Sequence, residues 1–337
     1  MGSLEKNFPI ISRRRFITLL GGLALAQTLS GCEWFNQPVS IATIVWPGYE
    51  PMFLARDKGW LNIHQVHLLE MASATDSLQA LAEGKADGAA LTLDEVLKAR
   101  AAGLALSVVM IFDISAGADM LIARSGIKQL ADLKGRRIGF EPGTVGELTL
   151  TEALQLAGLT KDDIKPVRLS TNKHREAWTR NEVDAIATYE PLASQLLGLD
   201  GIKLFDSRQI PNTIVDVLAI RDDVLDVYHA NAIRHLIAAH FRTLDYLNRN
   251  PQDAAYRMAT HIGLPAAKVL TAFKGLVLPD ITNNYRWLSG ASPELLVCAG
   301  KLSNIMVKNQ LLKQNDTLGS LIRSDFLPPV SGLVDYE

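Results

Sequence analysis

The chain has 337 residues, of which 48% are hydrophobic and 21% charged, and its formal net charge is −2. This length suits two lobes better than one domain, and the composition excludes general disorder. Without a basic run beyond the N-terminus we expect no nucleic-acid partner, and two cysteines, Cys32 and Cys298, exclude a disulfide-rich scaffold.

Residues 1–32 have the pattern of an export signal. Three arginines, Arg13 to Arg15, precede the uncharged, mainly apolar segment 16–29, and Leu-Ser-Gly-Cys ends at Cys32. The arginines followed by Phe16 resemble a twin-arginine (Tat) signal, and the last four residues resemble a bacterial lipobox. We expect Cys32 to be lipidated and residues 33–38 to form a tether. A generic secretory signal with a cysteine there by chance is the alternative.

The expected anchor is the acyl chain and not surface charge. Removing residues 1–31, with four basic residues and one acid, leaves 30 Lys and Arg against 35 Asp and Glu, a net charge of −5. An acidic mature chain is not attracted to anionic lipid. We therefore expect the acyl chains alone to hold the protein at the membrane.

From residue 39 onward, predicted strands alternate with predicted helices. Short β-branched and apolar runs predict strands at 41–46, 66–71, 88–91, 106–112, 119–123, 137–140, 167–169, 184–189, 203–205 and 214–220. Helical patterns lie between them, at 52–55, 76–83, 93–102, 147–157, 173–180 and 191–197, with a helical turn at 130–135. Thr92 and Glu95 form a capping box before the third helix. After Arg221 the chain is mostly helical, at about 225–249, 251–262, 265–275 and 293–313.

This alternation predicts an α/β fold with mainly parallel sheets. Two α/β series followed by helices indicate two lobes. We expect residues 39–115 and 214–337 to form a discontinuous lobe 1 and residues 116–213 to form lobe 2. The crossovers then fall near 113–119 and 211–216.

Several motifs resemble one family of transport proteins. They are Trp46-Pro47-Gly48-Tyr49 with Phe53-Leu54-Ala55 and Lys58-Gly59, then Ala86-Asp87-Gly88-Ala89, the stretch LADLKGRRIGFEPGT at 130–144, and Val183-Asp184-Ala185-Ile186 leading to Glu190-Pro191. In these motifs the chain resembles periplasmic solute-binding proteins of ABC importers, in the nitrate/sulfonate/taurine/thiamine-pyrimidine-type group. The resemblance extends from about residue 40 to residue 310. The resemblance implies the type II periplasmic-binding fold, with hinge crossovers and the C-terminal helices on lobe 1.

The resemblance also implies a function. The chain would be the lipid-anchored substrate-binding component of an importer, a monomer on the periplasmic side of the bacterial inner membrane. It would capture a small solute between its lobes and deliver it to the permease and ATPase, with no cofactor and no catalytic residue. Two alternatives remain: a ligand-sensing subunit of a signalling system, and an enzyme on the same fold, such as a thiamine-pyrimidine synthase relative.

Candidate ligand contacts lie where strands end and helices begin, because ligands of α/β sheets bind there. Gly143, Thr144 and Val145 offer backbone N–H groups at a helix start, a cradle for an anion or an ordinary capped turn. The rings of Trp46 and Tyr49 follow the first strand and either wall the cleft or plug the core. The hydroxyls of Thr75 and Thr92 serve as helix caps or as ligand donors.

Isolated acids in apolar strands are the remaining candidates. Asp113, Asp119, Glu190 and Asp216 lie at strand ends and at the expected crossovers, where burial is costly without a partner. They either pair with a cationic group of the ligand or hold the hinge turns. The backbone N–H cradle favours a negatively charged ligand, whereas the acids favour a positively charged one. A zwitterion such as an amino-sulfonate would satisfy both.

No metal site is expected. His64 and His67 are three residues apart in a predicted strand, and such positions point to opposite faces. We interpret His174, beside Lys173 and Arg175, as part of a solvated helix face or as an anion contact.

Overall fold

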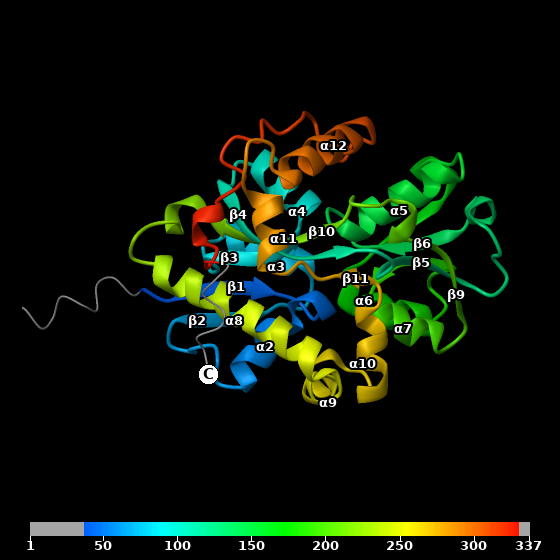
Figure 1. Cartoon of the computed structure of the whole chain (residues 1–337). Helices are drawn as coiled ribbons and strands as arrows, with labels where there is room; N and C mark the ends of the chain where they lie inside the picture. Colours follow the sequence, from blue (N-terminus) through cyan, green and yellow to red (C-terminus); the bar gives the residue numbers. More distant parts are fainter. Residues whose placement is uncertain (1–36, 330–337) are drawn as a thin grey trace, which may run out of the picture.

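The computed structural model describes residues 37–329. The expected signal peptide, Cys32 and residues 33–36 of the expected tether lie outside the described residues. Figure 1 shows an α/β protein with two sheets side by side and helices on the outer faces of both. No helix within 37–329 combines the length and apolar character needed to cross a membrane.

The first sheet has six strands, and they include the first four strands predicted from the sequence. In sheet order they are β11 (Leu276–Val277), β4 (Leu106–Ser115), β10 (Val215–Arg221), β3 (Gly88–Thr92), β1 (Val39–Thr43) and β2 (Val66–Glu70). The helices that accompany it are α2 (Glu50–Asp57), α3 (Ala74–Ala82), α4 (Leu93–Ala101), α8 (Ala230–Arg249), α9 (Pro251–Ile262), α10 (Ala266–Phe273), α11 (Ile281–Leu288) and α12 (Glu294–Lys308). We call this sheet with its helices lobe 1.

The second sheet has five strands. They are, in sheet order, β7 (Lys165–Arg168), β6 (Arg137–Phe140), β8 (Ala185–Tyr189), β5 (Asp119–Arg124) and β9 (Gly201–Asp206). Its helices are α5 (Val145–Leu156), α6 (Thr171–Thr179) and α7 (Leu192–Leu197). We call this sheet with its helices lobe 2, and we propose that the lobes divide at the residue boundaries expected from the sequence.

The α/β class is confirmed, but the sheets are mixed and not mainly parallel. β1 is parallel to β2 and β3, and β6 is parallel to β7 and β8. β10 and β5, by contrast, are antiparallel to both of their neighbours. The reason is topological, because strands that enter or leave a sheet at a crossover join it without the helix that forces parallel pairing.

The chain passes between the lobes twice, from β4 to β5 and from β9 to β10. The two passages are bound to each other. The Oγ atoms of Ser115 and Ser207 lie 2.8 Å apart, and Gly117 N donates to Ser207 Oγ at 2.6 Å. A pair of adjacent strands joined in this way is the arrangement on which hinge closure of two domains depends.

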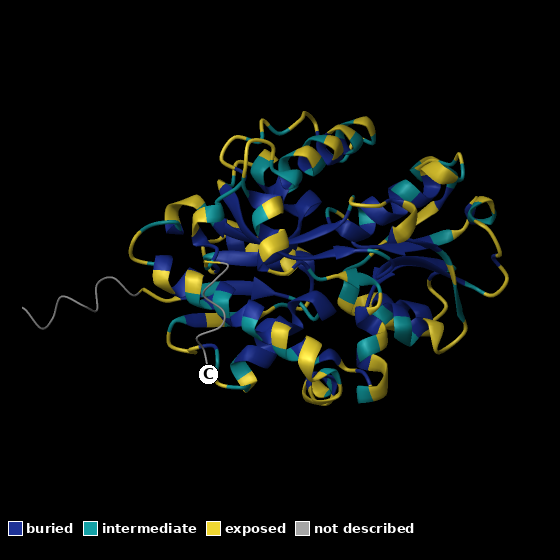
Figure 2. Ribbon diagram, in the orientation of Figure 1, coloured by how far each residue is buried: buried dark blue, intermediate teal, exposed yellow. Residues whose placement is uncertain are grey.

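The C-terminal helices cover lobe 1, as the resemblance implies. α8 packs against α2, and α12 packs against α4. The buried amide of Asn284 in α11 accepts from Ile111 N of β4 at 2.7 Å and donates to Ile111 O at 3.2 Å. In Figure 2 the central strands of both sheets are buried while the outer helix faces are exposed, so each lobe has its core at the sheet.

Candidate ligand-binding site

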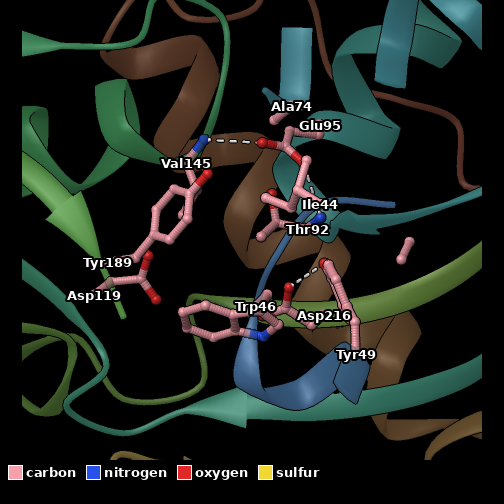
Figure 3. Close-up of a pocket in the computed structure, with 11 residues that line it drawn as sticks. Ile44, Trp46, Tyr49, Ala74, Thr92, Glu95, Asp119, Val145, Tyr189 and Asp216 are labelled. Carbon is pink, nitrogen blue, oxygen red and sulfur yellow. Dashed lines mark hydrogen bonds between the residues drawn. The ribbon is translucent and has the colours of Figure 1, made fainter. Parts of the chain in front are cut away.

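A cavity lies between the two lobes at the ends of their strands. Its volume is about 330 Å³. Both lobes line it, through Ile44, Trp46, Tyr49, Ala74, Ala90, Thr92, Glu95 and Asp216 of lobe 1 and Asp119, Val145 and Tyr189 of lobe 2 (Figure 3). None of these eleven lining residues is Lys, Arg, His, Cys or Ser.

Trp46 and Tyr49 lie in the turn that joins β1 to α2, and both are buried. Trp46 Nε1 donates to Asp113 Oδ2 at 2.9 Å, and the Tyr49 hydroxyl donates to Asp216 Oδ1 at 2.5 Å. Gly48, between them, is required because a Cβ there would lie 1.7 Å from Asp113 Oδ2. Each ring is thereby fixed by a carboxyl of a neighbouring strand.

The register of the strands gathers three aspartates at the crossovers. Asp216 of β10 is the partner of Asp113 in β4, and Asp119 of β5 is the partner of Tyr189 in β8. All three aspartates are at most 2% exposed. One carboxylate oxygen of each, Asp113 Oδ1, Asp119 Oδ2 and Asp216 Oδ2, has no hydrogen-bond partner among the described residues.

Burial and mutual repulsion raise the pKa of all three carboxyls. Burial, with a smaller contribution from neighbouring acids, raises the pKa of Asp113 to about 8 and the pKa of Asp119 to about 7. The pKa of Asp216 is raised well above its usual value, first by burial and then by the charges of Asp113 and Asp119. At neutral pH the cluster therefore carries less negative charge than three fully ionised aspartates would.

Glu95 connects α4 of lobe 1 to α5 of lobe 2. As the third residue of the capping box it accepts from Thr92 N at 3.0 Å, which confirms that motif. Its other oxygen accepts from Val145 N, at the start of α5, at 3.2 Å. Burial raises the pKa of Glu95 to about 8, although both of these hydrogen bonds favour the ionised form.

Glu141 makes a second connection between the lobes. Its Oε1 accepts from the N and Oγ1 of Thr75, which is in α3 of lobe 1, at 3.1 and 2.5 Å. Its Oε2 accepts from the N and Oγ1 of Thr171, which begins α6 of lobe 2, at 3.1 and 2.6 Å. One carboxylate thus occupies the N-termini of two helices, where a negative charge is favoured.

Six of the eleven residues predicted as ligand contacts line the cavity: Trp46, Tyr49, Thr92, Asp119, Val145 and Asp216. The rule that ligands bind at the carboxyl ends of strands brings four of these together. The two aspartates are there because the antiparallel crossover strands deliver them to the same edge.

The other five predicted contacts do not line the cavity, because the protein itself uses their polar groups. Asp113 accepts from Trp46 Nε1, and Thr75 donates to Glu141. Gly143 N donates to Glu147 Oε2 at 2.8 Å, and Thr144 Oγ1 accepts from Gly146 N at 3.3 Å as the cap of α5. Glu190 accepts from Ser194 N and Oγ, in the first turn of α7, at 3.1 and 2.8 Å.

Sequence reasoning missed five lining residues and misplaced one histidine. Glu95 was visible only as a helix cap, and Tyr189 only as the end of a strand. Ile44, Ala74 and Ala90 are small or apolar and carried no signal. His174 is buried and not on a solvated face, and burial lowers its pKa to about 4. No group of three or more potential metal ligands occurs in the described part of the chain.

Curated relatives share part of the sequence. A "Putative binding protein" of Brucella abortus (strain 2308) is 25% identical over 199 residues, 55% of this chain. The match spans 62% of that relative's length. A "Putative aliphatic sulfonates-binding protein" of Escherichia coli K12 is 29% identical over 206 residues, which cover 60% of this chain and 64% of that protein.

Solved structures share the fold. The alkanesulfonate-binding protein SsuA from Xanthomonas axonopodis pv. citri, bound to MOPS, superposes with a TM-score of 0.70 at 20% identity. The superposition covers 82% of this chain and 95% of that one. The desulfurization enzyme DSZB superposes with a TM-score of 0.63 at 14% identity, over 86% of this chain and 97% of that one.

The superpositions establish the fold, and at such low sequence identity they establish nothing beyond it. The sequence itself carries the membership. The family model described as "NMT1/THI5 like" matches residues 46–254, which is more than half of the chain. The chain therefore belongs to the NMT1/THI5-like family.

Proposed function

We propose that this protein is the extracytoplasmic solute-binding component of an ABC importer. It captures a small solute in the cavity between its lobes and presents it to a permease that works with an ATPase. The observation that carries the proposal is that the cavity is lined from both lobes and bridged by Glu95 and Glu141. A cavity of this kind opens and closes by motion about the paired crossovers.

The names of the curated relatives support the proposal, since both are called binding proteins. A catalytic role is less well supported. The lining lacks the cysteine, serine or histidine from which a nucleophile and its base are usually built. Cys298, in α12, does not line the cavity and is half-buried, and burial raises the pKa of its thiol.

The proposal includes a membrane anchor at Cys32, for which the support is the sequence pattern of residues 13–32. With the twin-arginine signal removed and Cys32 lipidated, the folded lobes would lie on the periplasmic side of the inner membrane. Lipid attachment would keep the protein near its permease, and residues 33–38 would supply the tether.

A direct test combines binding with a measurement of compactness. Small organic solutes are offered to the purified protein, and a binder is expected to raise the melting temperature by mass action and to lower the radius of gyration in small-angle scattering. Chemical turnover of any bound solute, or stabilisation with no change of compactness, would contradict a binding protein that closes on its ligand.

A further inference from the structure

We infer that the solute is an organic cation carrying N–H donors, such as a protonated amine, an amidine or a guanidine, held between Asp119 of lobe 2 and Asp216 of lobe 1. The inference rests on the proposed function, that is, on the interlobe cavity being the solute site. It goes further by fixing the charge and the hydrogen-bonding character of the ligand.

Two unused carboxylate oxygens point to a donor ligand. Asp119 Oδ2 and Asp216 Oδ2 are buried, belong to residues that line the cavity, and accept no hydrogen bond from an N–H or hydroxyl group within residues 37–329; the carboxyl of Asp216 lies beside that of Asp113, which is also buried. Figure 3 shows Asp119 on the side of Tyr189 and Asp216 on the side of Trp46 and Tyr49. Buried polar atoms are nearly always hydrogen-bonded, and carboxylates prefer charged N–H groups. A ligand with N–H donors satisfies both oxygens.

The donors that would bind an anion are already used by the protein. Helix N-termini attract negative charge. At the N-terminus of α5, Glu95 and Glu147 accept from Val145 N and Gly143 N. At those of α3 and α6, Glu141 accepts from the backbone N–H groups of Thr75 and Thr171. Internal carboxylates therefore take the positions that a sulfonate or nitrate would need.

The aromatic walls suit the same class of ligand. Trp46 and Tyr189 come from different lobes, and their ring centroids lie 5.6 Å apart with the planes at 85°. Tyr49 lies beside Trp46, with ring centroids 6.5 Å apart. Rings attract cations through their faces, an effect that strengthens when water is excluded. These rings offer a cationic head contact from both lobes.

A cation would also couple binding to closure. Asp119 and Asp216 belong to different lobes, and each raises the cost of ionising the other. Closure without a cation would require these carboxyls to be protonated, which disfavours the closed form when no solute is bound. With a cation between them both carboxyls can ionise, because the ligand charge replaces the protons. Binding should therefore release protons at neutral pH.

The test uses pairs of probes that match in shape and differ in charge. Acetamidinium is paired with acetate, guanidinium with nitrate, ethylammonium with ethanesulfonate, and benzamidinium with benzenesulfonate, with taurine as the zwitterion. Calorimetry on the full chain at millimolar probe concentrations measures binding. We expect binding by one or more cations, none by the matched anions, and weaker binding of taurine than of ethylammonium.

Variants locate the binding. Asp119→Asn and Asp216→Asn keep the shape of the side chain and should weaken the best cation roughly tenfold or more. Glu152→Gln is the matched control, since Glu152 also has a buried oxygen without a partner among the described residues but does not line the cavity. Its affinity should equal that of the wild type. The probe pairs on the wild type decide the question even if an Asn variant does not fold.

The outcomes separate the two proposals. The cation inference is overturned if an anion binds in preference to its matched cation, or if neither Asn variant changes the affinity for the best cation. Either result leaves the solute-binding role standing. Failure of every probe, of either charge, contradicts the solute site itself and with it the proposed function.

Discussion

Replacement of Glu141 by glutamine should open the cleft. The carboxylate accepts four hydrogen bonds, two from Thr75 in lobe 1 and two from Thr171 in lobe 2. A glutamine has one acceptor oxygen, so the backbone N–H on one side must face an N–H₂ group. If the oxygen stays with Thr171, which is in the same lobe as residue 141, the contact that breaks is the one to Thr75 in the other lobe.

The magnitude follows from the number and kind of bonds lost. A hydrogen bond to a charged group contributes about 1.5–3 kcal/mol. Loss of the connection to Thr75 should therefore shift the equilibrium between closed and open forms by roughly 10- to 150-fold, at about 1.4 kcal/mol per factor of ten. A ligand that binds the closed form loses affinity by the same factor once the closed form is the minor state.

Small-angle scattering measures the closed fraction, and calorimetry with the best probe measures the affinity. Glu147→Gln is the matched control, because Glu147 also binds a backbone N–H and a lysine, but both partners, Gly143 and Lys161, are in lobe 2. The reasoning is refuted if Glu141→Gln leaves closure and affinity at the wild-type values, or changes them no more than Glu147→Gln does.

Three further predictions concern other parts of the chain. The raised pKa values of Asp113 and Asp119, about 8 and 7, mean that the native state holds protons that the unfolded state has lost. The free energy of unfolding should therefore fall as pH rises from about 6.5 to 8, and it should fall less steeply in Asp119→Asn. Urea unfolding measures it, and a rise over this pH range would contradict the prediction. Gly48→Ala should destabilise the fold by about 1–3 kcal/mol, because its Cβ would meet Asp113, whereas Gly126→Ala, with nothing within 4 Å, should change the urea midpoint little; equal effects would disprove the packing argument. Cys32→Ser should move the protein from the membrane fraction to the soluble fraction and abolish labelling by a fatty-acid analogue, and continued membrane association would exclude the lipid anchor.

Much of the fold could be predicted because its determinants are local. Alternating apolar runs predict the strands near their observed places, and Thr92 with Glu95 predicts the start of α4. The two-residue strand β11 and the helix α11 were missed. β11 is paired only with the end of β4, and Asn284 of α11 bonds to Ile111, which is 173 residues away. Such partners are not visible in a local pattern.

The site shows the same division. Strand ends predict Trp46 and Tyr49, and acids isolated in apolar strands predict Asp119 and Asp216. The role of Glu141 could not be predicted, because its partners Thr75 and Thr171 are 66 and 30 residues away in the sequence. The N-terminus of α5 seemed a free anion site for the same reason, because Glu95, whose carboxylate accepts from Val145 N, is 50 residues away in the sequence.

The central claim is that a solute draws two lobes together around the Asp119–Asp216 cavity. The most direct test is the distance between spin labels at two exposed positions, Ile63 in lobe 1 and Leu156 in lobe 2, measured by pulsed electron resonance with and without the best binder. The account predicts a single shorter distance with the binder and a broader, longer distribution without it. Identical distributions in both samples, at a concentration that saturates binding, would contradict it.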